Sequence, residues 1–148
     1  MARVHDVAKY ILGACGEMTT MKLQKLCYYA QAWSLVWDGK PIFPDQIEAW
    51  VNGPVIPNLY QEHRGKFSVS ASELSFGDAN RLTSSERDTI DAVLDHYGSY
   101  SGTQLSQITH HESPWLDARV GCSQYERCQN VISLDAMADF YTAMYAEA

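Results

Sequence analysis

The chain has 148 residues, a mass of 16.7 kDa, a formal net charge of −7 and a pI near 5.1. This length is typical of one domain, and a hydrophobic content of 46% is enough for a packed core. The acidic charge argues against direct binding to a nucleic-acid backbone, which requires clustered lysines and arginines. We therefore expect a single domain over residues 1–148 without direct nucleic-acid binding.

The N-terminal segment carries a polar residue every few positions. It lacks the apolar run of a signal peptide or a membrane span, so we expect a cytoplasmic protein without membrane association. No C-x-x-C pair occurs. In a cytoplasmic protein the four cysteines are then expected to be reduced thiols: Cys15, Cys27, Cys122 and Cys128.

Apolar residues recur at spacings of three and four near the N-terminus, which predicts a first helix that ends at Gly13 or Gly16. A longer helix follows over residues 21–37, where Thr19 or Thr20 supplies a capping hydroxyl. Apolar side chains lie on more than one side of this second helix, so several neighbours must cover it. We expect it to be the central helix of the fold.

The apolar side chains of this central helix allow two interpretations. Leu26, Ala30 and Trp33 are expected to pack against the first and last helices. Tyrosine and tryptophan are also enriched at interfaces, because they combine apolar area with a polar tip. Other large side chains of the helix are therefore either core residues or anchors for a partner: Tyr28, Tyr29 and Leu35.

Residues 41–60 contain four prolines and an Asn52-Gly53 pair. This composition predicts turns and short extended pieces, followed by a short helix over residues 58–63. Trp50 and Asn52 lie in this segment, where loop residues are suited to the rim of an interface.

Capping-box patterns predict two more helices, beginning near Thr83 and Ser101, and a last helix begins near Ser133. No regular alternation of strands and helices occurs. The sequence therefore predicts a mainly α fold: a compact single-domain helical structure with a Pro/Gly-rich turn segment that has room for one or two short strands.

The stretch THHESPW, residues 109–115, allows a chemical interpretation. In zinc deaminases an H-x-E motif is followed by P-C-x-x-C, and His110 and Glu112 match its first part. The pair Cys122 and Cys128 fits poorly, because five residues separate the thiols and no proline precedes the first. A zinc-dependent hydrolase related to the deaminases is thus a weak alternative.

A structural interpretation explains the same residues, 109–115, without a catalytic role. Thr109 and His110 would end a helix, Pro114 would stop it and start another, and Trp115 would pack inward. Glu112 would then be a hydrogen-bond partner for His110. We favour this interpretation, and we expect no enzyme activity, no cofactor and no metal, since no nucleophile, base and orienting group occur at a spacing that specifies a site.

Three ordered stretches carry family-like motifs: K-L-Q-K-L-x-Y-Y-A-Q-x-W at residues 22–33, E-A-W-x-x-G-P-V at 48–55, and T-H-x-E-x-P-W-x-x-A-R at 109–119. Together they resemble the Panacea domain, which is found in SocA-like antitoxins and in proteins labelled phage-associated. The resemblance includes residues to which it assigns no role: Lys22, Gln24, Lys25, Trp33, Gly53, Pro54, Thr109, His110, Glu112, Pro114 and Trp115.

The resemblance implies an antitoxin that neutralises, by direct binding, a cognate protein toxin encoded in the same operon. One branch of the family acts instead as an adaptor that presents its toxin to a cytoplasmic protease. Many relatives carry an additional N-terminal helix-turn-helix domain; here the similar region begins almost at Met1, so we expect no DNA binding by this chain. Our candidates for toxin contacts are Tyr28, Tyr29, Leu35, Trp50 and Asn52.

Overall fold

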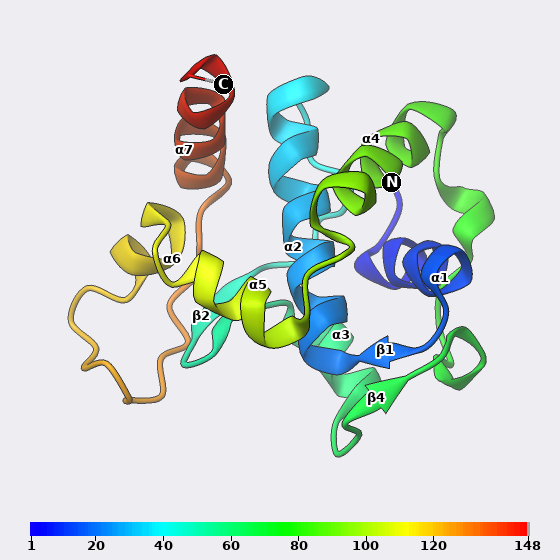
Figure 1. Ribbon diagram of the computed structural model, residues 1–148, viewed down its shortest axis with the longest axis horizontal. Coiled ribbons are helices and arrows are strands. Elements are labelled where there is room, and N and C mark those ends of the chain that lie inside the picture. Colours follow the sequence, from blue (N-terminus) through cyan, green and yellow to red (C-terminus); the bar gives the residue numbers. More distant parts are fainter. Residues whose placement is uncertain (148) are drawn as a thin grey trace.

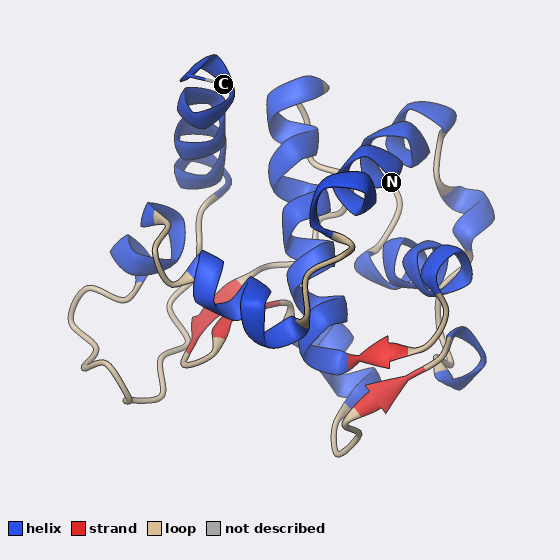
Figure 2. Cartoon of the chain, in the orientation of Figure 1, coloured by secondary structure: helices blue, strands red, loops and turns tan. Residues whose placement is uncertain are grey.

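The computed structural model describes residues 1–147, in which helices predominate and the strands form two short pairs (Figures 1 and 2). The α-helices are α1 (Val4–Cys15), α2 (Thr20–Trp37), α3 (Pro57–His63), α4 (Ser84–Tyr97), α5 (Gly102–Thr109), α6 (Ser113–Ala118) and α7 (Leu134–Glu147). The strands are β1 (Met18–Thr19), β2 (Glu48–Trp50), β3 (Gly53–Val55) and β4 (Ser68–Val69).

The prediction of a compact, mainly α fold is confirmed. The pairing of β1 with β4 was not predicted, because each strand has only two residues and leaves no alternating pattern in the sequence. Two 3₁₀ turns, at residues 71–73 and 79–81, were also not anticipated. None of the helices described here is long and apolar enough to cross a bilayer.

Helix α2 is the central element, as predicted. It contacts α1, α4, α5 and α7, and in Figure 1 it stands between α7 on one side and α1 with α4 on the other. The Thr19 hydroxyl accepts a hydrogen bond from the backbone nitrogen of Lys22, which caps the first turn. Leu26, Ala30 and Trp33 are all buried, as predicted, and Trp33 contacts Tyr141 of the last helix as well as Tyr97 of α4.

Tyr28 and Tyr29 are core residues, so they are not exposed anchors for a partner. The Tyr28 hydroxyl lies 3.0 Å from that of Tyr141 in α7. The ring of Tyr29 stacks on Tyr97 of α4, with 4.0 Å between the ring centroids. Helices on opposite sides of α2 thus cover both tyrosines, and interface assignments for them were wrong.

Two buried glutamines of α2 hold the extended segment that follows it. The Gln31 amide oxygen accepts a hydrogen bond from the Ile42 nitrogen, and its amide nitrogen donates to the Phe43 carbonyl, both at 2.8 Å. Seven residues earlier on the same helix face, Gln24 accepts from the Ile56 nitrogen at 2.8 Å. These side chains position residues 42–56 along α2 and satisfy backbone groups that would otherwise be buried without partners.

Replacement of Trp33 by alanine tests this core. Trp33 is 7% exposed, and its indole nitrogen donates to the Tyr97 hydroxyl at 3.1 Å. Trp33→Ala should lower the free energy of unfolding by roughly 3–5 kcal/mol, as measured by urea denaturation. Trp37→Ala, one turn later and 40% exposed, should cost clearly less. Equal losses in the two variants would contradict the proposed position of α2.

Candidate functional site

Strands β2 and β3 form a hairpin with a two-residue turn at Val51 and Asn52. Trp50 pairs with Gly53 at the end of the antiparallel ladder. Gly53 has a φ of +119°, a backbone conformation that glycine adopts readily and other residues rarely do. The Asn52-Gly53 pair thus produces a tight hairpin, which the sequence predicted only as turns and short extended pieces.

Four consecutive carbonyl groups of this hairpin, residues 49–52, each lie within hydrogen-bonding distance of a side chain from the segment 106–119. The pairs are Arg119 Nη1 with Ala49 at 2.8 Å, Trp115 Nε1 with Trp50 at 2.8 Å, His110 Nε2 with Val51 at 2.9 Å, and Ser106 Oγ with Asn52 at 2.5 Å. We call these four side chains the α5–α6 clamp. It fixes the hairpin backbone along its whole turn.

His110 and Glu112 do not pair with each other, so that part of the structural interpretation was wrong. The other ring nitrogen of His110 contacts the Ser106 carbonyl, and the ring lies against Trp115. Glu112 points away from the hairpin into the interior. The expected helix end at Thr109, the restart at Pro114 and the inward Trp115 are all confirmed.

The buried Glu112 carboxylate is an acceptor for two tyrosines. Tyr29 and Tyr141 donate their hydroxyl hydrogens to the same oxygen, Oε1, at 2.8 Å and 2.7 Å. Burial raises the pKa of Glu112 above its ordinary value, although the two tyrosine hydroxyls act in the opposite direction. This carboxylate therefore links α2, α7 and the start of α6.

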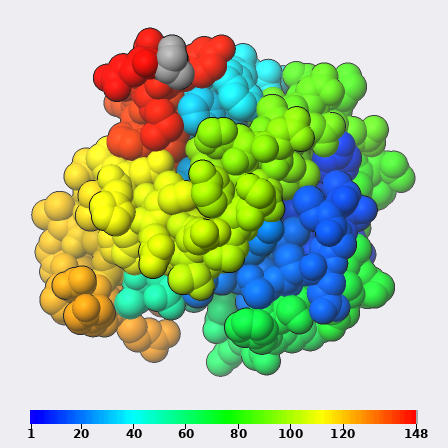
Figure 3. Space-filling view, viewed as in Figure 1, coloured from blue at the N-terminus to red at the C-terminus, as the bar shows by residue number. Residues whose placement is uncertain are grey.

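Arg119 joins the hairpin to the long connection before α7. Besides Ala49, its guanidinium donates to the carbonyls of Ser123 and Glu126, and it lies 5.2 Å from the Trp115 ring centroid. In Figure 3 this connection, coloured orange, flanks the small turquoise part of the hairpin that stays visible beneath the yellow helices.

Residues from all three family-like motifs meet beneath the hairpin. A Cβ atom on Gly53 would lie 2.5 Å from Cε of Lys25 and 2.9 Å from Oγ1 of Thr109. Gly53 thus leaves room for a lysine from α2, and the buried Thr109 comes from α5. These contacts give the family-like residues a shared structural location that their separation in sequence conceals.

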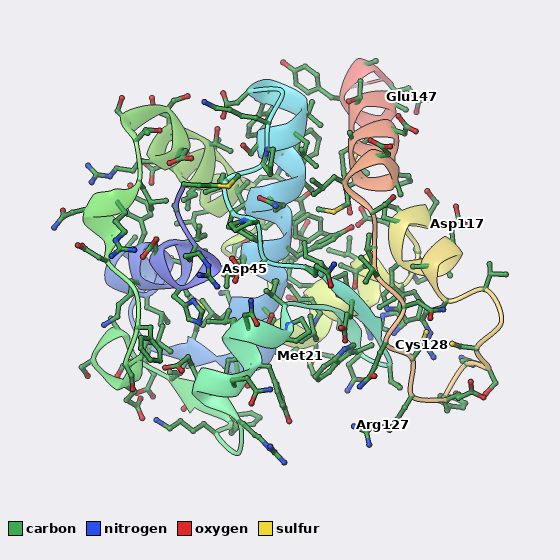
Figure 4. All side chains as sticks on the ribbon, turned by 180° about the vertical axis from the view of Figure 1, so that it is seen from behind. Met21, Asp45, Asp117, Arg127, Cys128 and Glu147 are labelled. Carbon is green, nitrogen blue, oxygen red and sulfur yellow. The ribbon has the colours of Figure 1, made fainter. Side chains whose placement is uncertain are left out.

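A pocket of about 300 Å³ opens beside the hairpin. Its lining comes from α2, the hairpin, α3 and the connection before α7, and Met21, Arg127 and Cys128 are labelled in Figure 4. The lining residues are Thr20, Met21, Gln24, Lys25, Trp50, Val51, Asn52, Val55, Tyr60, His63, Arg127, Cys128 and Gln129. We call this pocket together with the tip of the hairpin, residues 50–52, the hairpin face.

Lys25 is the least expected residue of the pocket. The residue is 1% exposed, and neither of the ion pairs within residues 1–147 involves its ammonium group. Burial lowers the pKa of Lys25 to about 7. Next to it, His63 accepts a hydrogen bond from the Gln24 amide at 2.9 Å, and burial together with the Lys25 charge lowers the pKa of His63.

Of the residues predicted to contact a toxin, only Trp50 and Asn52 lie on the hairpin face. Leu35 is half-buried against the core, and ten residues, roughly 15 Å of helix, separate it from Lys25. Sequence reasoning did not identify the pocket residues Tyr60 and His63, nor the clamp residues Ser106 and Arg119. Arg119 ends the third motif, but its backbone partners leave no signal in the sequence.

The zinc interpretation is not supported by the positions of its proposed ligands. The ring nitrogens of His110 face carbonyl oxygens, and Glu112 accepts hydrogen bonds from tyrosines in the interior. Cys128 is buried and lines the hairpin pocket, and its thiol interacts with that of Cys122. Across the described part of the chain, no three histidine, cysteine or acidic side chains are grouped as a metal site requires.

The fold and this face define a small helical domain with a clamped hairpin beside a pocket. The family model described as antitoxin SocA-like, Panacea domain, matches residues 23–116, more than half of the chain. The chain therefore belongs to this family, as its motifs suggested. Comparison with curated proteins and with solved structures gave no match.

A substitution at Gly53 tests the packing beneath the hairpin. Gly53→Ala should lower the free energy of unfolding by roughly 1–3 kcal/mol from backbone strain, and more if Lys25 cannot move aside. The matched control is Gly13→Ala in α1, where a Cβ meets nothing within 4 Å and should stabilise the helix by about 0.5–1 kcal/mol. Urea denaturation measures the change in the free energy of unfolding for both variants. No change in Gly53→Ala would contradict this packing.

The pH dependence of stability tests the buried carboxylate. Because the folded-state pKa of Glu112 is raised, the folded protein binds more protons than the unfolded chain above pH 4.5, the ordinary value. Wild-type stability should therefore fall, relative to the non-titrating Glu112→Gln variant, as the pH rises from 4.5 through the raised pKa. Urea denaturation across this pH range measures the difference in the free energy of unfolding between the two proteins.

Glu112→Ala serves as the control for this experiment. It removes the acceptor of both tyrosines and should destabilise the protein at every pH. Parallel stability curves for the wild type and Glu112→Gln would show that burial does not perturb this carboxylate.

Proposed function

We propose that this protein is an antitoxin that binds a protein toxin encoded in the same operon and inactivates it by direct contact. Membership of the SocA-like antitoxin family is the observation that carries this proposal. In this proposal the protein acts by binding rather than by catalysis. The hairpin face is the contact surface that the geometry favours.

The rigidity of the hairpin supports this choice of surface. Its turn is held at four carbonyls by the α5–α6 clamp, so little backbone freedom would be lost when a partner binds. Trp50 is further fixed by a hydrogen bond to Glu48 and by the edge of Tyr60, whose ring centroid is 5.0 Å away. Preorganised aromatic side chains of this kind are frequent anchors at protein interfaces.

Exposed hydrophobic side chains at the edges of the face also support it. Phe67 is 83% exposed, and its carbonyl accepts a hydrogen bond from the nitrogen of Thr20, which lines the pocket. Tyr125 is 81% exposed and lies two residues before the lining residue Arg127. Large apolar side chains at the borders of one pocket fit a surface that a protein partner covers.

Co-expression tests the proposed function. The neighbouring gene should arrest growth when expressed alone and become harmless with this protein, and the two proteins should co-purify. A toxin whose half-life stays constant indicates neutralisation by binding, whereas faster loss of the toxin in the presence of this protein indicates the protease adaptor. A harmless neighbour, or persistent toxicity without a recoverable complex, would exclude the antitoxin function.

A charge at the hairpin tip tests the contact surface. The Asn52 side chain is exposed, and the clamp holds only its carbonyl, so Asn52→Glu should leave the melting temperature nearly unchanged. We expect it to weaken toxin binding roughly tenfold or more, as measured by calorimetry. Thr142→Glu, on the exposed side of α7, is the matched control and should bind normally. Equal affinities of both variants would place the contact elsewhere.

A further inference from the structure

The Lys25 side chain is almost fully buried in the free protein, and among residues 1–147 no acidic side chain forms an ion pair with it. Lysines are almost never fully buried unless they are paired, because removal of an ammonium group from water costs several kcal/mol. The ion pairs found between residues 1 and 147 join Arg3 to Asp45 and Lys66 to Glu73, and neither involves Lys25. Something other than folding stability has to account for a lysine at this position.

The space next to Lys25 is suited to an acidic side chain. Met21, Val51 and Val55 supply apolar lining that can contact a hydrocarbon stem. Among the described residues that line the pocket there is no aspartate or glutamate, so this lining offers the Lys25 ammonium group no carboxylate acceptor. Asn52 and Arg127 are exposed lining residues, which makes the pocket accessible from the surface.

We propose that Lys25 is the receptor for an acidic side chain of the bound toxin, which enters the pocket beside the hairpin and pairs with the Lys25 ammonium group. This inference rests on the proposed function and adds the chemistry of one contact. The toxin is the expected source of the carboxylate because the pocket is lined by the hairpin tip, and because the exposed Phe67 and Tyr125 are near lining residues, Phe67 through its hydrogen bond with Thr20 and Tyr125 two positions before Arg127. A buried pair at the centre of an interface contributes strongly to specificity.

Formation of this pair should change the protonation of Lys25. With a pKa near 7, much of Lys25 in the free protein is neutral at pH 8, whereas a carboxylate beside it favours the charged form. The other titratable groups that line the pocket are His63 and Tyr60 of α3, with Arg127 and Cys128 of the connection before α7. His63 has a lowered pKa and is neutral at pH 8, so binding should draw a proton onto Lys25.

The experiment compares wild type, Lys25→Met and the exposed-lysine control Lys40→Met. Calorimetric titration of each with the purified toxin at pH 8, in two buffers that differ in ionisation heat, gives the affinity and the proton uptake. Lys25→Met should fold at least as stably as wild type, bind roughly 30-fold more weakly and lose the proton uptake. Lys40→Met should behave as wild type in both respects.

The acidic residue of the toxin can be identified by double-mutant cycles. Single Asp→Asn and Glu→Gln variants of the toxin are combined with Lys25→Met, and one of them should weaken wild-type binding but have little further effect on the Lys25→Met complex. Additive losses for every toxin carboxylate would contradict the pairing.

The remaining outcomes also test whether Lys25 pairs with a carboxylate of the toxin. Unchanged affinity and proton uptake in Lys25→Met overturn it while leaving the antitoxin function intact. Failure of wild-type protein to bind the toxin removes both. Sodium propionate, a small free carboxylate, provides the last test. In the contrary result, millimolar propionate raises the melting temperature of wild type but not of Lys25→Met, while both proteins bind the toxin equally. That result would mean that the pocket accepts a free carboxylate and not a side chain of the toxin.

Discussion

The contacts between the α5–α6 clamp and the carbonyls of residues 49–52 determine how this molecule presents its surface. Strands of three residues do not form a stable hairpin by themselves in water. Their carbonyl groups also need partners when helices cover them. The clamp meets both requirements, and it extends to the connection before α7 through Arg119. The sequence THHESPW is therefore architectural: it holds a hairpin in place.

The polar groups in the interior differ in how completely they are satisfied. Gln24 and Gln31 pair with backbone groups of the segment that follows α2, and the Glu112 carboxylate receives two tyrosine hydroxyls. Such contacts fix one arrangement of the helices, because any other arrangement would leave these groups without partners. Within residues 1–147 neither ion pair involves Lys25, which distinguishes it from these hydrogen-bonded interior residues.

Local signals in the sequence predicted the helices well. Capping residues such as Thr83 and Ser101 act on backbone groups three positions away, so their effect is visible in a short pattern. The hairpin was only partly predicted, since the Asn52-Gly53 pair indicates a turn but not the elements that cover it. The α5–α6 clamp could not be predicted, because its partners are backbone carbonyls more than fifty residues away.

The distinction between core and interface also needed the structure. A helix with apolar residues on several faces indicates that something covers it, but the pattern does not distinguish another helix from a partner protein. For Tyr28 and Tyr29 the cover is α4 and α7, which leaves the hairpin as the better contact surface. Motif residues such as Gln24, Gly53 and Thr109 are buried, so they form the packed interior that supports the hairpin. In the proposed function, recognition of a particular toxin then depends on the exposed residues around them, and on Lys25 as a buried motif residue that lines the pocket.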